Sequence, residues 1–277
     1  LGSPVAHSIS PLMHNESFRL LGLDYVYLCF DVNEETLPAA VAGLKTCGIR
    51  GFNLTMPNKN KIVELLDELS PEAQLIGAVN TVLNDNGKLI GYNTDGYGFM
   101  QSVRDAGHDI TGKNITVMGV GGASMAICAQ SALDGAASVH IFARRTSRYW
   151  NRTQKFAENL SAKTGCQVCL FDNDDHTALR DSIAQSYLLI NATSVGMVPD
   201  IDDTIIKDTS LFHPELVVAD VVYEPQETRL LREAKAAGCQ TFNGMYMLLH
   251  QGAKAFQIWT GQEMPVSVIK EKYFSVK

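Results

Sequence analysis

The chain has 277 residues, which is enough for two domains with hydrophobic cores of their own. Hydrophobic residues make up 45% of it and charged residues 19%, a balance typical of globular rather than disordered proteins. The net charge of −7 argues against a nucleic-acid surface, and no apolar run approaches the roughly 18 residues that a membrane span needs. The composition therefore predicts a globular protein without a nucleic-acid or membrane partner.

Six cysteines are scattered along the chain. Cys166 and Cys169 form one C-x-x-C, but they lie in an apparent strand, without the second pair or nearby histidine that a zinc site needs. We interpret them as core thiols, and we expect no metal site. Reduced thiols favour a cytoplasmic location.

The first part of the chain alternates predicted helices and strands. A helix is predicted to begin at Ser10-Pro11, a serine N-cap followed by proline, and to end near Gly22. The further predicted elements are a strand at 25–32, a helix at 35–46, a strand at 49–56, a helix at 61–69, a strand around Asn80, a turn at 85–87 and a helix at 99–106.

Polar side chains gather near the ends of these strands. Asn53 and Thr55 lie two apart and face the same side of one strand, while Lys59, Asn80 and Asp95 lie near other strand ends. The carboxyl ends of strands in open α/β sheets are where ligands bind, so a site is predicted there. Ordinary alternatives are the wet face of a sheet and a solvated lysine.

Two serines lie at the start of the first predicted helix. Simple capping would explain Ser10, but Ser8 and Ser10 together place two hydroxyls at a helix N-terminus. Such a terminus also suits a carboxylate, because its N–H groups and its dipole favour negative charge.

A glycine-rich turn follows the apolar run 115–118. Gly119, Gly121 and Gly122 precede a small-and-apolar segment at 123–133 that is predicted to be a helix. Strand, glycine turn and helix together favour a dinucleotide site, because backbone N–H groups and a helix N-terminus point toward one pyrophosphate. Ser124 stands where the third small residue of this pattern is expected.

The second strand of this region, predicted at 138–142, ends at Ala143. An NAD-binding chain is expected to carry Asp or Glu there for the ribose hydroxyls. This chain instead has Arg144, Arg145 and Arg148, whose guanidinium groups favour a 2′-phosphate and hence NADP. The alternative is a basic loop exposed to solvent.

The remaining pattern again alternates strands and helices, which predicts parallel βαβ units. The predicted elements are strands at 167–171, 187–191 and 216–222 and helices at 228–237, 245–260 and 265–273. The fold class is therefore α/β with two domains and a cleft between them. Residues 1–100 plus 245–277 form a smaller substrate-binding and catalytic domain, and residues 101–244 a Rossmann-type doubly wound parallel domain for the dinucleotide.

Seven motifs occur in order along nearly the whole chain: PVAHSISPLMHN, GFNLTMPNK, GAVNT, GYNTDGYG, GVGGAS, NATSVGM and DVVYEP. Together they resemble the shikimate dehydrogenase family, including its quinate/shikimate dehydrogenase branch. The resemblance implies reversible hydride transfer between a nicotinamide cofactor and the ring alcohol of shikimate, giving 3-dehydroshikimate. Quinate and 3-dehydroquinate are the alternative substrate and product that the resemblance leaves open.

The resemblance also assigns residues to roles. Lys59 and Asp95 match the catalytic pair, and the Ser8 and Ser10 hydroxyls match the groups that hold the substrate carboxylate. Neutral residues match those lining the substrate, as expected for a polyhydroxylated ring: Asn53, Thr55, Asn80, Thr94, Tyr223 and Gln251. The cofactor positions are Gly119, Gly121, Gly122, Ala123, Ser124, Arg144, Arg145, Arg148, Thr193, Val221, Gly244 and Met247.

The chain departs from the family pattern at the cofactor end. NADP-using members usually carry Asn-Arg-Thr where this chain has Ala143-Arg144-Arg145, although Arg148 keeps the distal arginine. The quinate/shikimate branch, which other motifs resemble, often carries an acidic residue where this chain has Thr146. We expect NADP as the cofactor, with NAD as the alternative.

Two features stay open. The chain is expected to be a monomer or a homodimer. A non-catalytic protein of the same fold, sensing a metabolite or nucleotide, is the alternative to an enzyme, but a sensor needs neither Lys59 nor Asp95.

Overall fold

The computed structural model describes residues 1–274 and divides into two compact units. The first comprises Leu1–Gly98 and Leu248–Lys277, and the second comprises Phe99–Met247. The predicted boundaries, after residues 100 and 244, lie close to these. The last three positions of the predicted segment 245–277 lie outside the described residues.

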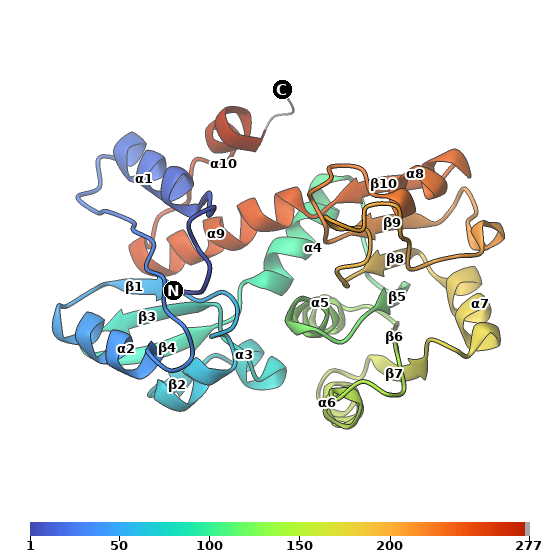
Figure 1. The fold of residues 1–277 in the computed structure, drawn as a ribbon, viewed down its shortest axis with the longest axis horizontal. Coiled ribbons are helices and arrows are strands. Elements are labelled where there is room, and N and C mark those ends of the chain that lie inside the picture. Colours follow the sequence, from blue (N-terminus) through green and yellow to red (C-terminus); the bar gives the residue numbers. More distant parts are fainter. Residues whose placement is uncertain (275–277) are drawn as a thin grey trace. The chain divides into compact units, whose positions relative to one another are not determined.

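The second unit is built on a parallel six-stranded sheet in the order β10-β9-β8-β5-β6-β7 (Figure 1). Its strands are β5 (Asn114–Met118), β6 (Ser138–Ala143), β7 (Gln167–Asp172), β8 (Leu188–Asn191), β9 (Val217–Asp220) and β10 (Gln240–Asn243). Read from β7, this is the order of a doubly wound nucleotide fold, with its switch point between β5 and β8. The predicted Rossmann-type architecture is therefore confirmed.

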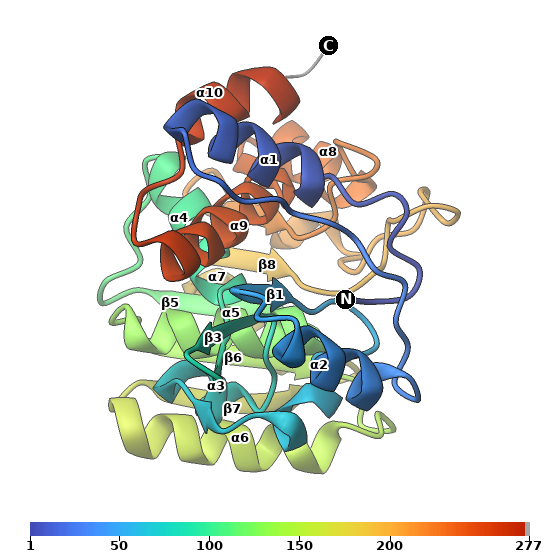
Figure 2. The ribbon, with the colours of Figure 1, turned by 90° about the vertical axis from the view of Figure 1, so that its left-hand side faces the viewer.

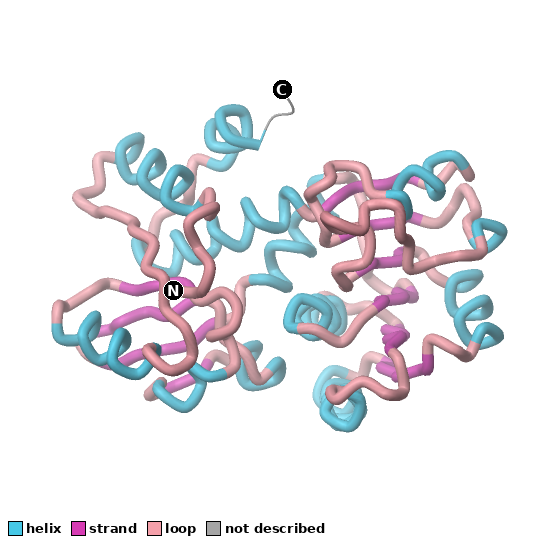
Figure 3. The backbone as a smooth tube through the Cα atoms, in the orientation of Figure 1, coloured by secondary structure: helices cyan, strands magenta, loops and turns pink. Residues whose placement is uncertain are grey.

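Helices cover both faces of this sheet (Figures 1 and 3). They are α5 (Gly122–Leu133), α6 (Trp150–Thr164), α7 (His176–Gln185) and α8 (Arg229–Ala236), with a 3₁₀ turn at Thr209–Leu211. Side chains of α7 and α8 pack into one hydrophobic cluster with Met118, Phe142 and Val218 of the sheet. The strands β8 and β9 are buried along their whole length, as expected for strands with helices on both faces.

The first unit contains a four-stranded mixed sheet in the order β1-β3-β4-β2. Its strands are β1 (Gly51–Asn53), β2 (Glu68–Leu69), β3 (Thr81–Asp85) and β4 (Lys88–Tyr92). The helices are α1 (Ser10–Leu21), α2 (Leu37–Thr46), α3 (Pro71–Ile76) and α10 (Val266–Ile269), with a 3₁₀ turn at Lys61–Leu65 and a π-helical end at Lys270–Phe274. Figure 2 shows this unit from its own side, with α2 beside the sheet.

The chain passes from one unit to the other within two helices. These are α4 (Asp95–Asp105) and α9 (Met245–Thr260). The first residue of α4 and the middle of α9 belong to the first unit, where both carry predicted site residues.

The predicted strand at 25–32 is not formed, apart from a single bridge between Gly2 and Asp31. Residues of this segment and of β1 together line a pocket of about 190 Å³. Because no strand lies alongside, the alternating side chains have no sheet to join. The backbone of Tyr27 bonds instead to the side chain of Asn15.

Two other elements differ from prediction near the site. The predicted helix at 61–69 shortens to the 3₁₀ turn, because Leu66 turns to an extended conformation and Glu68–Leu69 pair with β4. The helix α4 begins four residues earlier than predicted. Two side chains fix its start, since Asn93 Oδ1 accepts from the Asp95 N–H and Asn80 Oδ1, on a distant part of the chain, accepts from the Thr94 N–H.

The start of α1 is also shifted by one residue. Ile9 is the N-cap and Ser10 is the first helical residue, while Ser8 Oγ accepts from the Ser10 N–H at 3.3 Å. Ser10 is therefore not the N-cap, and the side-chain bond at this end of the helix comes from Ser8. The helix ends at Gly22, in the left-handed conformation, as predicted.

Candidate active site

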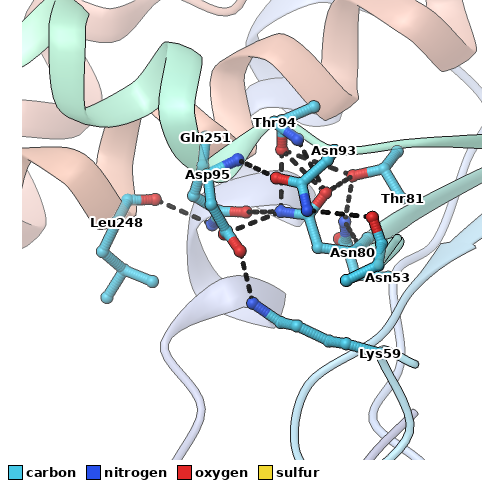
Figure 4. A network of polar contacts seen from close by, with 10 residues as sticks. Asn53, Lys59, Asn80, Thr81, Asn93, Thr94, Asp95, Leu248 and Gln251 are labelled. Atoms are coloured by element: carbon cyan, nitrogen blue, oxygen red, sulfur yellow. Dashed lines mark hydrogen bonds and ion pairs between the residues drawn. The ribbon is translucent and has the colours of Figure 1, made fainter. Parts of the chain in front are cut away.

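An ion pair between Lys59 and Asp95 lies in the first unit (Figure 4). Lys59 Nζ is 2.5 Å from Asp95 Oδ2, and the two side chains are 25% and 8% exposed. The backbone of Lys59 is fixed by a bond from the Val79 N–H to its carbonyl, at 2.8 Å. Asp95 is the first residue of α4, where the helix dipole stabilises its charge.

Asn80 holds Asp95 from the other side. Its Nδ2 donates to Asp95 Oδ1 at 2.8 Å and to Thr94 Oγ1 at 2.9 Å, and it lies 3.4 Å from Gln251 Oε1. Its Oδ1 accepts from the Thr94 N–H at 2.8 Å. Both oxygens of the Asp95 carboxylate are thus engaged, one by a cation and one by an amide.

Asn53 extends this network across the sheet. Its Nδ2 donates to the Asn80 carbonyl and to Thr81 Oγ1, both at 3.0 Å. Its Oδ1 accepts from the Tyr27 hydroxyl at 2.8 Å. Six predicted residues are therefore joined through described hydrogen bonds: Asn53, Lys59, Asn80, Thr94, Asp95 and Gln251.

The other predicted substrate residues lie outside these bonds. Ser8 and Ser10 are half-buried at the start of α1, and Thr55 is exposed beyond β1. Tyr223 belongs to the second unit, where it follows β9 and is 42% exposed. Gln251 Nε2 is bound to the Leu248 carbonyl, 2.9 Å away within α9.

A buried histidine packs against Tyr27, the residue that bonds to Asn53 of this site. His14 is fully buried on α1 and stacks on Tyr27, with ring centroids 4.5 Å apart and planes 8° from parallel. Neither ring nitrogen has a hydrogen-bond partner among the described residues. Burial therefore lowers the pKa of His14 from its ordinary 6.5 to about 3.

His14 should make the fold sensitive to acid. Between about pH 6.5 and pH 3 the unfolded chain binds a proton at this residue and the folded chain does not, so stability falls as pH falls. Relative to His14→Phe, the unaltered chain is expected to lose roughly 2 kcal/mol more unfolding free energy between pH 7.5 and pH 5. Urea unfolding of both proteins at both pH values measures this, and equal losses would contradict it.

The second unit contains the glycine turn after β5. Gly119 has φ +113°, and a Cβ there would lie 2.9 Å from the Ala192 carbonyl oxygen, so only glycine fits. Ser124 is fully buried and its hydroxyl donates to the Gly119 carbonyl at 2.5 Å. A Cβ at Gly121 or Gly122 would meet nothing within 4 Å, which leaves the start of α5 open to a phosphate.

The basic loop after β6 presents its arginines on aromatic rings. The guanidinium of Arg145 lies 4.8 Å from the Trp150 ring centroid, and that of Arg148 lies 4.7 Å from the Tyr149 ring centroid. Arg148 also donates to the Tyr149 hydroxyl at 2.6 Å. These contacts hold two of the three guanidinium groups at the end of β6, where they fit a 2′-phosphate.

A shared network fixes the loops that follow β8 and β9. Asp220 is fully buried, and its carboxylate accepts from Asn191 Nδ2, from the Val222 N–H and from Thr228 Oγ1. Asn191 in turn accepts from the Thr193 hydroxyl at 2.6 Å. Burial raises the pKa of Asp220 above its ordinary value. The network holds Thr193 in place on one loop.

Gly244, Val221 and Met247 complete the predicted cofactor positions. A Cβ on Gly244 would lie 2.1 Å from the Val221 carbonyl oxygen, so the chain after β10 passes directly against the loop after β9. Met247 is half-buried in the first turn of α9.

A curated relative decides the family of the chain. The shikimate dehydrogenase (NADP(+)) of Listeria innocua is 52% identical over 274 residues, which cover 99% of this chain and 94% of the relative. This chain belongs to the shikimate dehydrogenase family. Residues 1–82 match the family model described as the shikimate dehydrogenase substrate binding domain, and residues 244–272 match the shikimate 5′-dehydrogenase C-terminal domain.

Solved structures of shikimate dehydrogenase family relatives have the same fold. Shikimate 5-dehydrogenase from Listeria monocytogenes, in complex with shikimate and NAD, has a TM-score of 0.94 at 51% identity, covering 98% of this chain and 93% of that one. Quinate dehydrogenase from Corynebacterium glutamicum, in complex with NAD, has a TM-score of 0.87 at 31% identity, covering 99% and 97%.

Two polar residues of the candidate active site were not predicted from the sequence. Thr81 follows Asn80 directly in the GAVNT motif and could have been found there. Tyr27 belongs to the alternating stretch that was predicted as a strand, and no local signal identifies it as a site residue.

The Cys166 thiol is buried, and burial raises its pKa to about 11, as expected for a core cysteine.

Residues 1–274 contain neither a membrane-spanning helix nor a metal-binding cluster. No helix there is both long and apolar enough to cross a membrane. No three His, Cys, Asp or Glu side chains in that range lie together as a metal site requires.

Proposed function

We propose that this chain catalyses the reversible, NADP-dependent interconversion of shikimate and 3-dehydroshikimate. The ion pair of Lys59 and Asp95, 2.5 Å apart and joined to neutral amides and hydroxyls, carries the proposal. A proton-transferring group beside neutral donors and acceptors suits the oxidation of a polyhydroxylated ring. A binding protein would need no such pair.

Lys59 is the proposed proton carrier. Oxidation of the alcohol requires its oxygen to lose a proton while its carbon loses a hydride, and Lys59 Nζ, as the neutral amine, takes that proton and becomes the ammonium. In the reductive direction the Lys59 ammonium returns it to the carbonyl oxygen. Asp95 holds the amine in place, and Asn80 holds Asp95.

The ring is bound by the remaining residues of the first unit. Ser8 and Ser10 are proposed to donate to the carboxylate at the start of α1, with the helix N-terminus adding to the attraction. The amides of Asn53, Asn80 and Gln251 and the hydroxyls of Thr55 and Thr94 are proposed to face the ring hydroxyls. Tyr223, the remaining predicted substrate residue, belongs to the second unit.

The second unit is proposed to bind NADP, which accepts the hydride when bound. Gly119, Gly121, Gly122 and Ala123 would present backbone to the pyrophosphate, and Ser124 would stabilise the turn through its bond to the Gly119 carbonyl. Arg144, Arg145 and Arg148 would bind the 2′-phosphate. Thr193, Val221, Gly244 and Met247 are proposed to lie along the nicotinamide half.

An absorbance assay at 340 nm tests the function. Shikimate and quinate are each supplied with NADP and with NAD, and turnover is expected to be fastest with shikimate and NADP. Turnover with quinate would extend the substrate range. Absence of turnover with all four pairs, together with ligand-induced thermal stabilisation, would favour a sensor instead.

Arg148 is expected to discriminate between the two cofactors. Arg148→Ala should raise KM for NADP roughly tenfold, because it removes charge-assisted bonds to the 2′-phosphate, and leave KM for NAD within about twofold. The matched control is Arg180→Ala, an exposed arginine on α7 that should change neither constant. An unchanged KM for NADP would mean that Arg148 is a solvent-exposed residue that does not bind the 2′-phosphate.

A further inference from the structure

Tyr27 lies in an irregular segment of the first unit, yet its backbone and its ring are both fixed by α1. Its N–H donates to Asn15 Oδ1 at 2.7 Å, and Asn15 Nδ2 donates back to its carbonyl at 2.9 Å. Its ring stacks on His14 with planes 8° from parallel. A segment that joins no sheet thus presents one side chain in a fixed position.

The hydroxyl of Tyr27 reaches one of the proposed substrate groups. It donates to Asn53 Oδ1 at 2.8 Å. Asn53 is proposed to bind a ring hydroxyl. Tyr27 is therefore a direct link between α1 and the proposed substrate site.

The direction of this link follows from counting hydrogens. Both amide hydrogens of Asn53 are used, by the Asn80 carbonyl and by Thr81 Oγ1. A carbonyl can only accept, so the Asn53 amide cannot be flipped and its oxygen must face Tyr27. Tyr27 must then donate to Asn53.

Asn53 consequently has one capacity left for a ligand. The second lone pair of Oδ1 can accept from a hydroxyl, while no N–H of its side chain remains to donate. Burial raises the pKa of the Tyr27 hydroxyl, which keeps that hydroxyl protonated and donating at all working pH values.

We propose that Tyr27 is a positioning residue of the substrate site, which holds the Asn53 carbonyl oxygen in the orientation that accepts a hydrogen bond from a ring hydroxyl. The inference rests on the proposed function, because it takes shikimate as the ligand.

Tyr27→Phe removes only the hydroxyl and tests the proposal. KM for shikimate is expected to rise roughly tenfold, with kcat and KM for NADP within about twofold, because the lost contacts serve the ground state and the transition state alike. The matched control is Tyr25→Phe, a tyrosine on the same segment that is 44% exposed. It should leave all three constants unchanged.

A double-variant cycle with Asn53→Ala separates positioning from a purely structural role. If Tyr27 acts through Asn53, the rise in KM of the double variant will be smaller than the product of the two single rises. The proposal is overturned if the rise in KM of the double variant equals the product of the two single rises, or if Tyr27→Phe lowers kcat and leaves KM unchanged. If the unaltered chain does not turn over shikimate, the proposed function fails instead, and thermal shifts with shikimate still compare Tyr27→Phe with the unaltered chain.

Discussion

Lys59→Met is expected to lower kcat for shikimate oxidation by roughly 10²- to 10⁴-fold, the range that general acid–base catalysis contributes. Methionine keeps the apolar stem of the side chain but has no group that can take or return a proton. Asp95, only 8% exposed, then keeps Asn80 as its neutral donor and loses its cation. The loss should appear in both reaction directions, since the same atom carries the proton each way.

Lys61→Met is the matched control for this variant. Lys61 lies two residues further on, is 41% exposed and pairs with Glu64 on the surface. It should retain full activity. Titration of both variants with NADPH, followed by nucleotide fluorescence, should show unchanged nucleotide binding. A kcat for Lys59→Met within tenfold of the unaltered chain would remove Lys59 from the proposed mechanism.

Gly244→Ala is expected to lower the free energy of unfolding by roughly 3 kcal/mol or more, because the added methyl group would overlap with backbone atoms. The Cβ would lie 2.1 Å from the Val221 carbonyl oxygen and 2.6 Å from the Val221 carbonyl carbon, both backbone atoms. Either β10 separates from the loop after β9 or the nucleotide site distorts. Thermal and urea unfolding measure the loss.

At a second glycine, Gly121→Ala is expected to change cofactor binding and not stability. Its Cβ would meet nothing within 4 Å, and φ is −79°, which alanine adopts freely. The fold should keep its stability while KM for NADP rises, since the methyl group occupies the space proposed for the pyrophosphate. Equal stabilities for the two glycine variants would contradict the assignment of Gly244 to packing and of Gly121 to binding.

The elements that could be predicted are those whose causes are local. The glycine turn at Gly119 and the end of α1 at Gly22 both depend on a backbone conformation that glycine adopts readily. The strands β5, β8 and β9 depend on continuous apolar runs. These signals lie within a few residues of the features they produce.

The elements that were missed depend on distant residues. The segment 25–32 alternates like a strand but has no neighbouring strand to pair with. The polar sequence of β10 gives no strand signal, and only its pairing with β9 makes it one. The early start of α4 requires the side chain of Asn80, which accepts from the Thr94 N–H across the sheet.

The candidate site shows the same division. Lys59, Asn80 and Asp95 stood out near predicted strand ends and received their roles from the family resemblance, but their distances and the order of their hydrogen bonds came only from the structure. Tyr27 was missed because its side chain reaches the site through tertiary contacts with α1 and β1. Its neighbours in sequence do not indicate that position.

Both oxygens of the Asp95 carboxylate are occupied, one by Asn80 and the other by Lys59. In the proposed mechanism Asp95 therefore only positions the lysine, and the Lys59 nitrogen alone exchanges a proton with the substrate. Acid–base chemistry that depends on one nitrogen can be tuned at one place, through the groups that surround Lys59.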